Sequence, residues 1–303
     1  MSSSSAQITL VKPKIGGEAS SVIGEGRPRI PWRALGRHAF LLLMCFWVLF
    51  PLFIVVINSL KSRVDSAQRT ILPDEFVSPI WAHYEWVWRA FTLDNIFFRV
   101  YWNSIFVTAM TIAAGTISAV LAGYALSHLA TPGKSALLLL LVASLFFPMQ
   151  ITSMLGIFRL HWDLGLIDET WALMLPYVAA STAVSILVMR AVFQMVSREL
   201  PDSARVDGAS SLRILLGIML PQVRNGIVVV VVINFMYAWS EFVLASVLMN
   251  DQVSRTLAVL MGGGGVGPGI SAMFIVALVP GVLFLGIAQR WYGKALQDGA
   301  FKG

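Results

Sequence analysis

Long runs of apolar residues alternate with short polar segments along most of this chain. Six of these runs reach the ~20 residues that an α-helix needs to cross a lipid bilayer. They lie at about residues 38–60, 103–126, 135–158, 171–193, 226–249 and 271–291. The pattern therefore predicts an all-α membrane protein with six transmembrane helices, whose two termini lie on the same side.

The fourth connection, residues 197–221, interrupts this pattern with charged side chains and turn residues. Pro201 suits the first turn of a helix, where its missing N–H group would be unpaired in any case, and Asp202 suits the positive end of that helix. Gly208 can adopt the left-handed conformation that often ends a helix. The segment therefore begins as a short helix followed by a glycine turn.

A second short helix is predicted after this turn, with Ser210 and Ser211 as candidate caps. Its apolar residues fall at i, i+3, i+4 and i+7 and would form a single stripe made of Leu212, Leu215, Leu216 and Met219. Pro221 is expected to break this helix before the next apolar run. A charged pair of helices at a membrane surface suggests a segment that another protein grips.

Basic residues indicate the orientation of the chain. Of the 22 Lys and Arg residues, 15 fall on the side of the two termini and 7 on the opposite side. Because cytoplasmic loops carry the excess of positive charge, both termini and residues 197–221 are expected in the cytoplasm. The same bias explains the net charge of +6 without a nucleic-acid partner.

Residues 1–37 are rich in Ser, Gly, Pro and basic side chains and show no periodic apolar face. Such a composition favours a flexible tail. A cleavable signal peptide is not expected, because the first apolar run arrives late and is long. The chain is therefore divided into a cytoplasmic tail, residues 1–37, and a transmembrane domain, residues 38–303.

Composition excludes several classes of protein. The chain is 57% hydrophobic and 13% charged, whereas soluble domains carry about a quarter charged residues. Its single cysteine, Cys45, permits no internal disulfide and is expected to be a small buried hydrophobe. The four histidines lack metal-ligand spacing, so no metal site is expected.

No motif for catalysis or nucleotide binding is visible. The chain has no GxxxxGK[ST] and no HExxH sequence. The glycine cluster at residues 262–267 lacks a following Lys-Ser or Lys-Thr and is expected to be a flexible outer loop. The energy for any transport must therefore come from an ion gradient or from a partner that hydrolyses nucleotide.

Polar groups inside the predicted spans are candidates for a solute path. Glu241 is the only acid within a span, and it shares a helix face with Asn234 and Tyr237 at i, i+3 and i+7, next to Ser240. This face either lines a solute path or forms a structural hydrogen bond that locks helix packing. Both interpretations stay open.

Two further segments also allow two interpretations each. In the third span, Pro148, Gln150, Thr152 and Ser153 form a polar, kink-prone patch that is either a packing kink or a substrate contact. The first outer segment, residues 61–102, carries several Trp and Tyr residues. These lie either at headgroup depth or against an extracytoplasmic partner.

Residues 197–221 resemble the cytoplasmic loop shared by the membrane subunits of ATP-binding-cassette (ABC) importers, whose pattern runs Glu-Ala-Ala, then Asp-Gly-Ala, then an Ile-x-Leu-Pro ending. The matching residues are Asp202, Ser203 and Ala204 for the first part, Asp207, Gly208 and Ala209 for the second, and Ile218, Leu220 and Pro221 for the third. Ser203 departs from the small apolar residue that is usual there.

Other stretches also resemble carbohydrate permeases of this family. They are AWSEF at residues 238–242, LGLIDETWALMLPY at 164–177 and QRWYGKALQDGAFKG at 289–303. The resemblance covers about residues 51–303. It points to permeases of the maltose, glycerol-phosphate and oligosaccharide type, nearest the smaller six-span subunit.

This resemblance implies the fold of a type I ABC importer transmembrane domain in the bacterial plasma membrane. It also implies a soluble solute-binding protein, a second related permease subunit and an ATPase dimer as partners, with ATP and Mg²⁺ bound by the ATPases and no cofactor on this chain. The residues implied in coupling to the ATPases are Glu199, Asp202, Ala204, Asp207, Gly208, Ala209, Leu220 and Pro221.

The main alternative is a secondary transporter driven by an ion gradient. Such a protein is expected to show inverted repeats and several buried ionisable residues. This chain has one acid within its predicted spans and no obvious repeat. An integral membrane enzyme would need a catalytic cluster near one interface, and none is visible.

Overall fold

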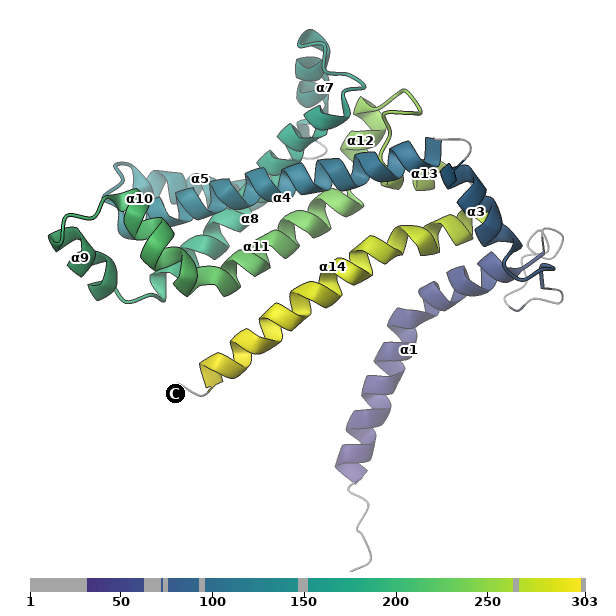
Figure 1. Cartoon of the computed structure of the whole chain (residues 1–303), viewed down its shortest axis with the longest axis horizontal. Helices are drawn as coiled ribbons and strands as arrows, with labels where there is room; N and C mark the ends of the chain where they lie inside the picture. The colour runs from purple at the N-terminus through teal and green to yellow at the C-terminus, as the bar shows by residue number, and fades with distance from the viewer. Residues whose placement is uncertain are drawn as a thin grey trace, which may run out of the picture. The chain divides into compact units, whose positions relative to one another are not determined.

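The computed structural model describes residues 32–62, 72, 76–92, 96–146, 152–263 and 267–300, which are largely helical (Figure 1). The chain divides into two compact units, Met1–Phe50 and Pro51–Gly303, and α1 crosses their boundary. The helical elements are α1 Trp32–Leu60, α3 Ala82–Thr92, α4 Ile96–His128, α5 Lys134–Phe146, α7 Met154–Asp163, η1 Thr170–Leu173, α8 Met174–Gln194, α9 Glu199–Val206, α10 Ser211–Ile214, η2 Leu215–Met219, α11 Leu220–Ser240, α12 Val243–Leu248, α13 Leu257–Gly263 and α14 Pro268–Ala300.

The described part of the first unit is the apolar beginning of α1. The most apolar 18-residue window of Gly36–Leu60 has a mean hydropathy of 3.0, and none of that window is buried. Cys45 is exposed on this helix, so the expectation of a buried thiol is wrong. An all-round apolar helix of this kind suits lipid or a partner helix rather than water.

Five helices of the described chain are long and apolar enough to cross a membrane. They are Gly36–Leu60, Ile96–His128, Thr170–Gln194, Ser211–Ser240 and Pro268–Arg290. The predicted third span, residues 135–158, is not one helix: α5 ends at Phe146, and α7 is a separate helix that packs against α12. The expected single helix is therefore wrong in extent, and the count of six spans stays a prediction.

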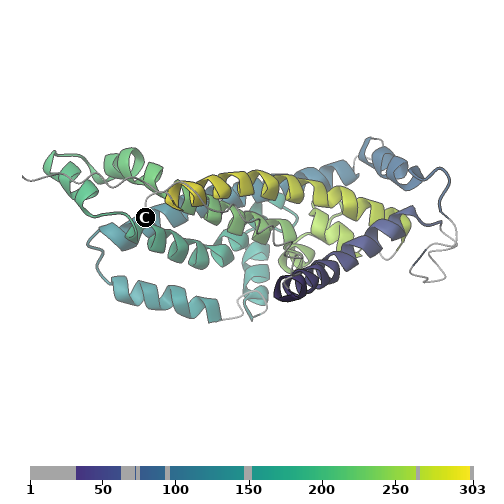
Figure 2. The ribbon, with the colours of Figure 1, turned by 90° about the horizontal axis from the view of Figure 1, so that it is seen from below.

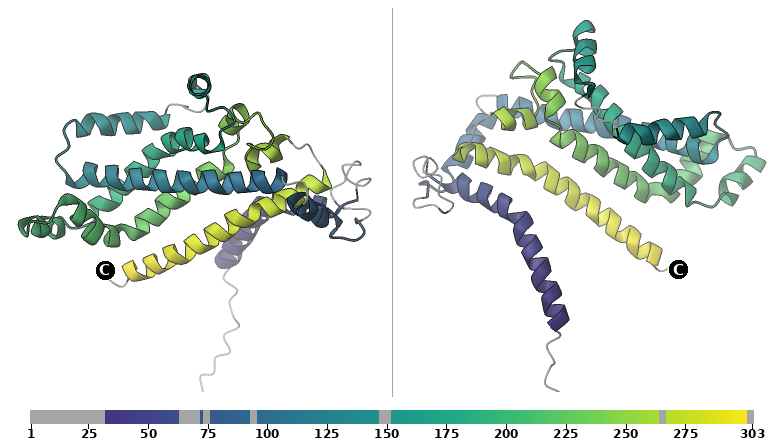
Figure 3. Two further views of the ribbon diagram at one scale, coloured as in Figure 1. Left: turned by 45° about the horizontal axis from the view of Figure 1, so that its top comes forward. Right: turned by 180° about the vertical axis from the view of Figure 1, so that it is seen from behind.

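Helices α4, α8 and α11 form the central bundle of the second unit and lie side by side in both views of Figure 3. Small residues allow their backbones to approach closely. A Cβ atom placed on Gly123 of α4 would lie 2.7 Å from Cβ of Met189 on α8, and one on Gly226 of α11 would lie 2.7 Å from Cγ1 of Val192. In a membrane, where lipid tails are as apolar as the helices, such close packing is what drives association.

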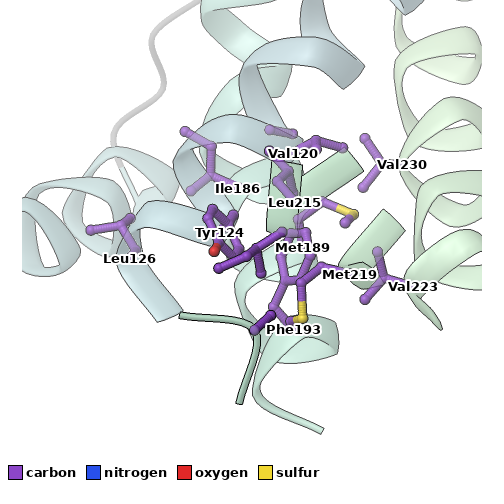
Figure 4. Close-up of a cluster of buried hydrophobic side chains, with 13 residues drawn as sticks. Val120, Tyr124, Leu126, Ile186, Met189, Phe193, Leu215, Met219, Val223 and Val230 are labelled. Carbon is purple, nitrogen blue, oxygen red and sulfur yellow. The ribbon is translucent and has the colours of Figure 1, made fainter. Parts of the chain in front are cut away.

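A hydrophobic cluster closes one end of this bundle (Figure 4). Tyr124 of α4 and Phe193 of α8 make an edge-to-face ring contact with centroids 5.7 Å apart. Ile214 and Met219, from α10 and η2, belong to the same cluster and are fully buried. The cluster thereby holds α10, η2 and the start of α11 against α4 and α8.

Pro221 does not break the helix as expected. Residues 211–240 form one continuous helix in which η2 is a π-helical segment. A proline ring clashes with the carbonyl group four residues earlier, here that of Gly217, and it cannot donate a hydrogen bond to it. The wider π turn directly before Pro221 accommodates this missing bond, so the chain keeps its direction.

The predicted fifth span, residues 226–249, does contain a break. Helix α11 ends at Ser240, Glu241 adopts an extended conformation, and α12 then begins at Val243. Leu244, Ala245 and Leu248 of this short helix are buried in a second cluster together with Leu173 and Tyr177. Helix α12 is therefore packed into the protein rather than continuing α11.

The second unit has two distinct ends. Figure 2 shows the α9–α10 segment at one end and α3 at the other, near α13 (Figure 1). Helices α4, α8 and α14 run toward the end that carries α9, and α5 and α11 run away from it. In the predicted topology successive spans cross the membrane in opposite directions, and the alternating directions of these helices agree with it.

Candidate functional site

Helix α9 presents most of its polar residues to solvent. Its buried residues are Pro201 and Ala204, of which Ala204 belongs to the hydrophobic cluster, while Glu199 and Asp202 in its first turn are exposed. Acidic side chains at a helix N-terminus are favoured by the helix dipole. The predicted start of this helix is thus confirmed.

The glycine turn is a Schellman motif. Gly208 has φ +78°, its N–H donates to the carbonyl oxygen of Arg205 at 3.0 Å, and the Ala209 N–H donates to that of Ala204 at 3.0 Å. These two bonds satisfy carbonyl groups that a helix end otherwise leaves unpaired. The left-handed residue at Gly208 was predicted from the sequence, and the geometry confirms it.

Ser210 caps the second helix. Its Oγ accepts a hydrogen bond from the Arg213 N–H at 3.4 Å, and Ser211 is the first helical residue. The predicted apolar stripe is split, because the helix packs through Ile214, Leu215 and Met219. Leu212 and Leu216 are instead 59% and 56% exposed.

Arg205 fastens α9 to the end of α4. Its guanidinium group forms an ion pair with Asp202 and donates to the carbonyl oxygen of His128 at 3.1 Å. The His128 ring stacks on Tyr124, a member of the buried cluster, with centroids 5.7 Å apart. Residues 197–221, called the coupling segment below, are therefore held on the bundle by both packing and hydrogen bonds.

The residues predicted for coupling divide by exposure. Ala204 is buried, and Ala209 and Leu220 are partly buried, so they hold the segment in shape. The exposed ones are Glu199, Asp202, Asp207, Gly208 and Pro221. The sequence pattern did not single out Val206, which is 88% exposed beside them.

Asn234 lies at the centre of the bundle, where it is fully buried. Its Oδ1 accepts from the Ser181 hydroxyl at 2.7 Å, and its Nδ2 donates to the Val230 carbonyl oxygen at 2.9 Å and to the Ser185 hydroxyl at 3.4 Å. Gly115 of α4 makes room for this side chain. These contacts favour a structural lock over a solute-facing role.

Glu241 does not share a helix with Asn234 and Tyr237, because α11 ends at Ser240. Its carboxylate accepts hydrogen bonds from the N–H groups of Leu244 at 2.7 Å and Ala245 at 3.1 Å, and from the Tyr177 hydroxyl at 2.8 Å. It thereby caps α12 and ties it to α8. The prediction of one polar face is wrong here, because the chain turns at Glu241.

The other residues predicted for a solute path lie in different settings. Tyr237 is partly buried and meets the Tyr177 ring edge to face. Ser240 is exposed, donates to the Met236 carbonyl oxygen at 2.6 Å, and lines an open groove of about 460 Å³ with Trp239, Phe242 and Phe274. Gln150 and Pro148 lie outside the described residues; Thr152 is exposed and Ser153 partly buried.

Comparison with known proteins identifies relatives that match most of this chain. Residues 114–298 match the family described as "Binding-protein-dependent transport system inner membrane component". The sulfoquinovosyl glycerol transport system permease protein of Agrobacterium fabrum is 30% identical, over 84% of this chain and 89% of that protein. The sn-glycerol-3-phosphate transport system permease protein of Escherichia coli is 26% identical, over 88% and 97%.

The fold is also found among solved structures. A chain of a bacterial ABC transporter involved in the import of the acidic polysaccharide alginate superposes with a TM-score of 0.73 and 21% identity, covering 86% of this chain and 96% of that one. This likeness supports the expected fold of an ABC importer transmembrane domain. The family match over residues 114–298 shows that the chain belongs to the family of inner membrane components of binding-protein-dependent transport systems.

Proposed function

We propose that this chain is a permease subunit of an ATP-driven ABC importer for a carbohydrate or a related polyhydroxylated solute. It forms the solute path with a second, related permease subunit and receives its substrate from a solute-binding protein outside the cell. The coupling segment rests on a dimer of ATPase subunits, which bind and hydrolyse ATP with Mg²⁺. The chain itself supplies no catalytic residue.

The observation that carries this proposal is the apolar surface of the coupling segment. Val206, Leu212 and Leu216 are all more than half exposed, although the distribution of basic residues predicts that this segment lies in the cytoplasm rather than in lipid. Exposed apolar side chains on short helices are typical of a surface that fits a groove on a partner protein. The Schellman turn and the Arg205–His128 bond give that surface a fixed shape.

Three observations support a carbohydrate as the substrate class. The named solutes of the relatives, sulfoquinovosyl glycerol and sn-glycerol-3-phosphate, are both polyhydroxylated. The transporter of the similar solved structure imports a polysaccharide. In this chain the open groove beside Ser240 is lined by the aromatic rings of Trp239, Phe242 and Phe274, and aromatic faces suit the apolar faces of sugar rings.

The proposal is tested by purifying the complex of this subunit with its second permease and ATPase subunits and reconstituting it in liposomes. Uptake of the sugar is expected to require both ATP and the binding protein. It should persist when an ionophore collapses the ion gradients. Uptake that is abolished by the ionophore and indifferent to ATP would support the secondary transporter instead.

Val206→Gln tests the role of the coupling segment in the same assay. Removing this exposed apolar contact is expected to reduce the amount of ATPase that co-purifies and to lower uptake, with normal membrane insertion. The matched control is Leu155→Gln, because Leu155 is 81% exposed but lies on α7, away from the coupling segment. If both variants co-purify with the same amount of ATPase, the exposed apolar surface of the coupling segment does not bind the ATPase.

A further inference from the structure

The turn that follows α12 is held by side chains from other parts of the chain. We call residues 250–256 the outer turn, since they lie in the third predicted outer connection. The Oδ1 atom of Asp168 accepts hydrogen bonds from the N–H groups of Asn250 at 2.5 Å and Asp251 at 2.8 Å. One carboxylate oxygen thus binds two successive backbone groups more than eighty residues further along the chain.

Residues near the start of α4 and before α8 bind the remainder of this turn. The side-chain amide of Asn103 donates to the carbonyl oxygens of Val253 at 2.8 Å and Arg255 at 3.0 Å. The Thr170 hydroxyl donates to the Ser254 carbonyl oxygen at 3.0 Å. Three polar side chains, including Asp168, therefore fix the backbone of the outer turn.

The backbone of Asp168 is itself unusual. Its φ is +65°, and it is the one residue other than glycine with positive φ within the described ranges. Its N–H donates to the carbonyl oxygen of Leu248, the last residue of α12, at 3.1 Å. Non-glycine residues rarely adopt this conformation, and when they do the surrounding structure holds them there, often at functional sites.

The residues in the first half of the outer turn are exposed. Asn250, Asp251, Gln252 and Val253 are all exposed, although their backbone is bound from beneath. A loop whose backbone is already fixed loses little backbone conformational freedom when it binds a partner. This arrangement is that of a preorganised recognition element on the predicted outer face.

We propose that Asp168 is a positioning residue that holds the outer turn in the conformation against which the solute-binding protein docks. The inference rests on the proposed function, because that function supplies the partner. It adds which turn the partner meets and which side chain keeps that turn in place. Asp168 acts through the turn and touches neither the solute nor the ATPases.

Three variants of the reconstituted complex separate this role from general stability. Asp168→Gly removes the carboxylate but keeps a residue that accepts positive φ without strain. Asp168→Asn keeps an acceptor oxygen and also tolerates the left-handed conformation. Asp163→Asn is the control, because Asp163 is an exposed acid on neighbouring α7 that pairs with Arg159, outside the outer turn.

The measured quantity is the concentration of binding protein that gives half-maximal stimulation of ATP hydrolysis. For Asp168→Gly we expect it to rise about tenfold, the factor that corresponds to ~1.4 kcal/mol, with unchanged unstimulated hydrolysis. Asp168→Asn should recover most of the wild-type value, and Asp163→Asn should match it.

The outcomes also separate this inference from the proposed function. If the wild-type complex shows no stimulation by the binding protein, the proposed function itself fails. If the wild type is stimulated and Asp168→Gly has the same half-maximal concentration, Asp168 does not position the docking surface. An Asp168→Gly variant that lowers stimulated and unstimulated hydrolysis equally would show a merely structural role, and would also overturn the inference.

Discussion

Single residues decide how closely the central helices of this subunit pack. Gly115 faces Asn234, whose amide is bonded to Ser181 and Ser185 on α8. A polar side chain in a membrane protein is stable in such a place because its hydrogen bonds are satisfied within the protein. The absence of a side chain at Gly115 is what leaves room for it.

The substitution Gly115→Ala is expected to destabilise the subunit. The new Cβ would overlap Oδ1 of Asn234, so the helices must separate or the amide must give up its bonds. Overpacking of this kind costs about 1–3 kcal/mol.

Thermal unfolding in detergent measures the effect of Gly115→Ala. Gly286→Ala on α14 is the control, because nothing lies within 4 Å of the added Cβ there. If the Gly115→Ala variant is as stable as the wild type, with the control unchanged, the contact with Asn234 relaxes without cost.

At the scale of elements, the first half of the coupling segment, residues 197–210, is the part that the sequence predicted best. Its signals are local: Pro201 lies in the first turn of a helix, Gly208 ends that helix, and Ser210 caps the next. Because each acts within one turn of chain, the hydrogen bonds that it forms depend little on the rest of the fold.

Gly208→Ala is expected to open the Schellman turn. An alanine at φ +78° costs about 1–2 kcal/mol, and relaxing it would move α9 relative to α10. The amount of ATPase that co-purifies should therefore fall. The matched control is Gly217→Ala in η2, where the added Cβ meets nothing within 4 Å and φ is not positive. A loss that is equal in both variants would argue against a specific need for the left-handed residue.

Two other boundaries escaped prediction for a physical reason. The break at Glu241 occurs inside an apolar run without glycine or proline, and it depends on the Tyr177 hydroxyl and on N–H groups of α12 that the carboxylate caps. The π turn of η2 keeps the helix continuous through Pro221, which local rules treat as a stop. Tertiary contacts and backbone adjustments of this kind do not change the spacing of apolar and polar residues, so the sequence pattern could not predict them.

At the scale of the molecule, α8 joins the two ends of the second unit. Near the start of α8, the Tyr177 hydroxyl donates to Glu241, and Asp168, a few residues before α8, binds the outer turn. Near the end of α8, Phe193 packs in the hydrophobic cluster that holds the coupling segment. This geometry links the predicted outer face to the predicted cytoplasmic face through one helix. The division of charge in the sequence predicts which end is which.

Single cysteines test that orientation. In a Cys45→Ser background, we expect Gln252→Cys on the outer turn to react with a membrane-impermeant maleimide in spheroplasts, whose outer membrane has been permeabilised. Ser203→Cys on α9, also exposed, should react only in inverted vesicles. The reverse labelling pattern would invert the topology.

The close contacts at Gly115, Gly123 and Gly226 also limit which positions of the subunit can be mutated in protein engineering. Since the spacing of α4, α8 and α11 depends on them, a mutational library that varies these three positions is expected to contain mostly destabilised variants. Exchanges among Leu, Ile, Val and Phe on α5, which has no buried residue, should leave the subunit's own fold intact. Selection for a new substrate is therefore best begun outside the central bundle, with the three glycines held constant.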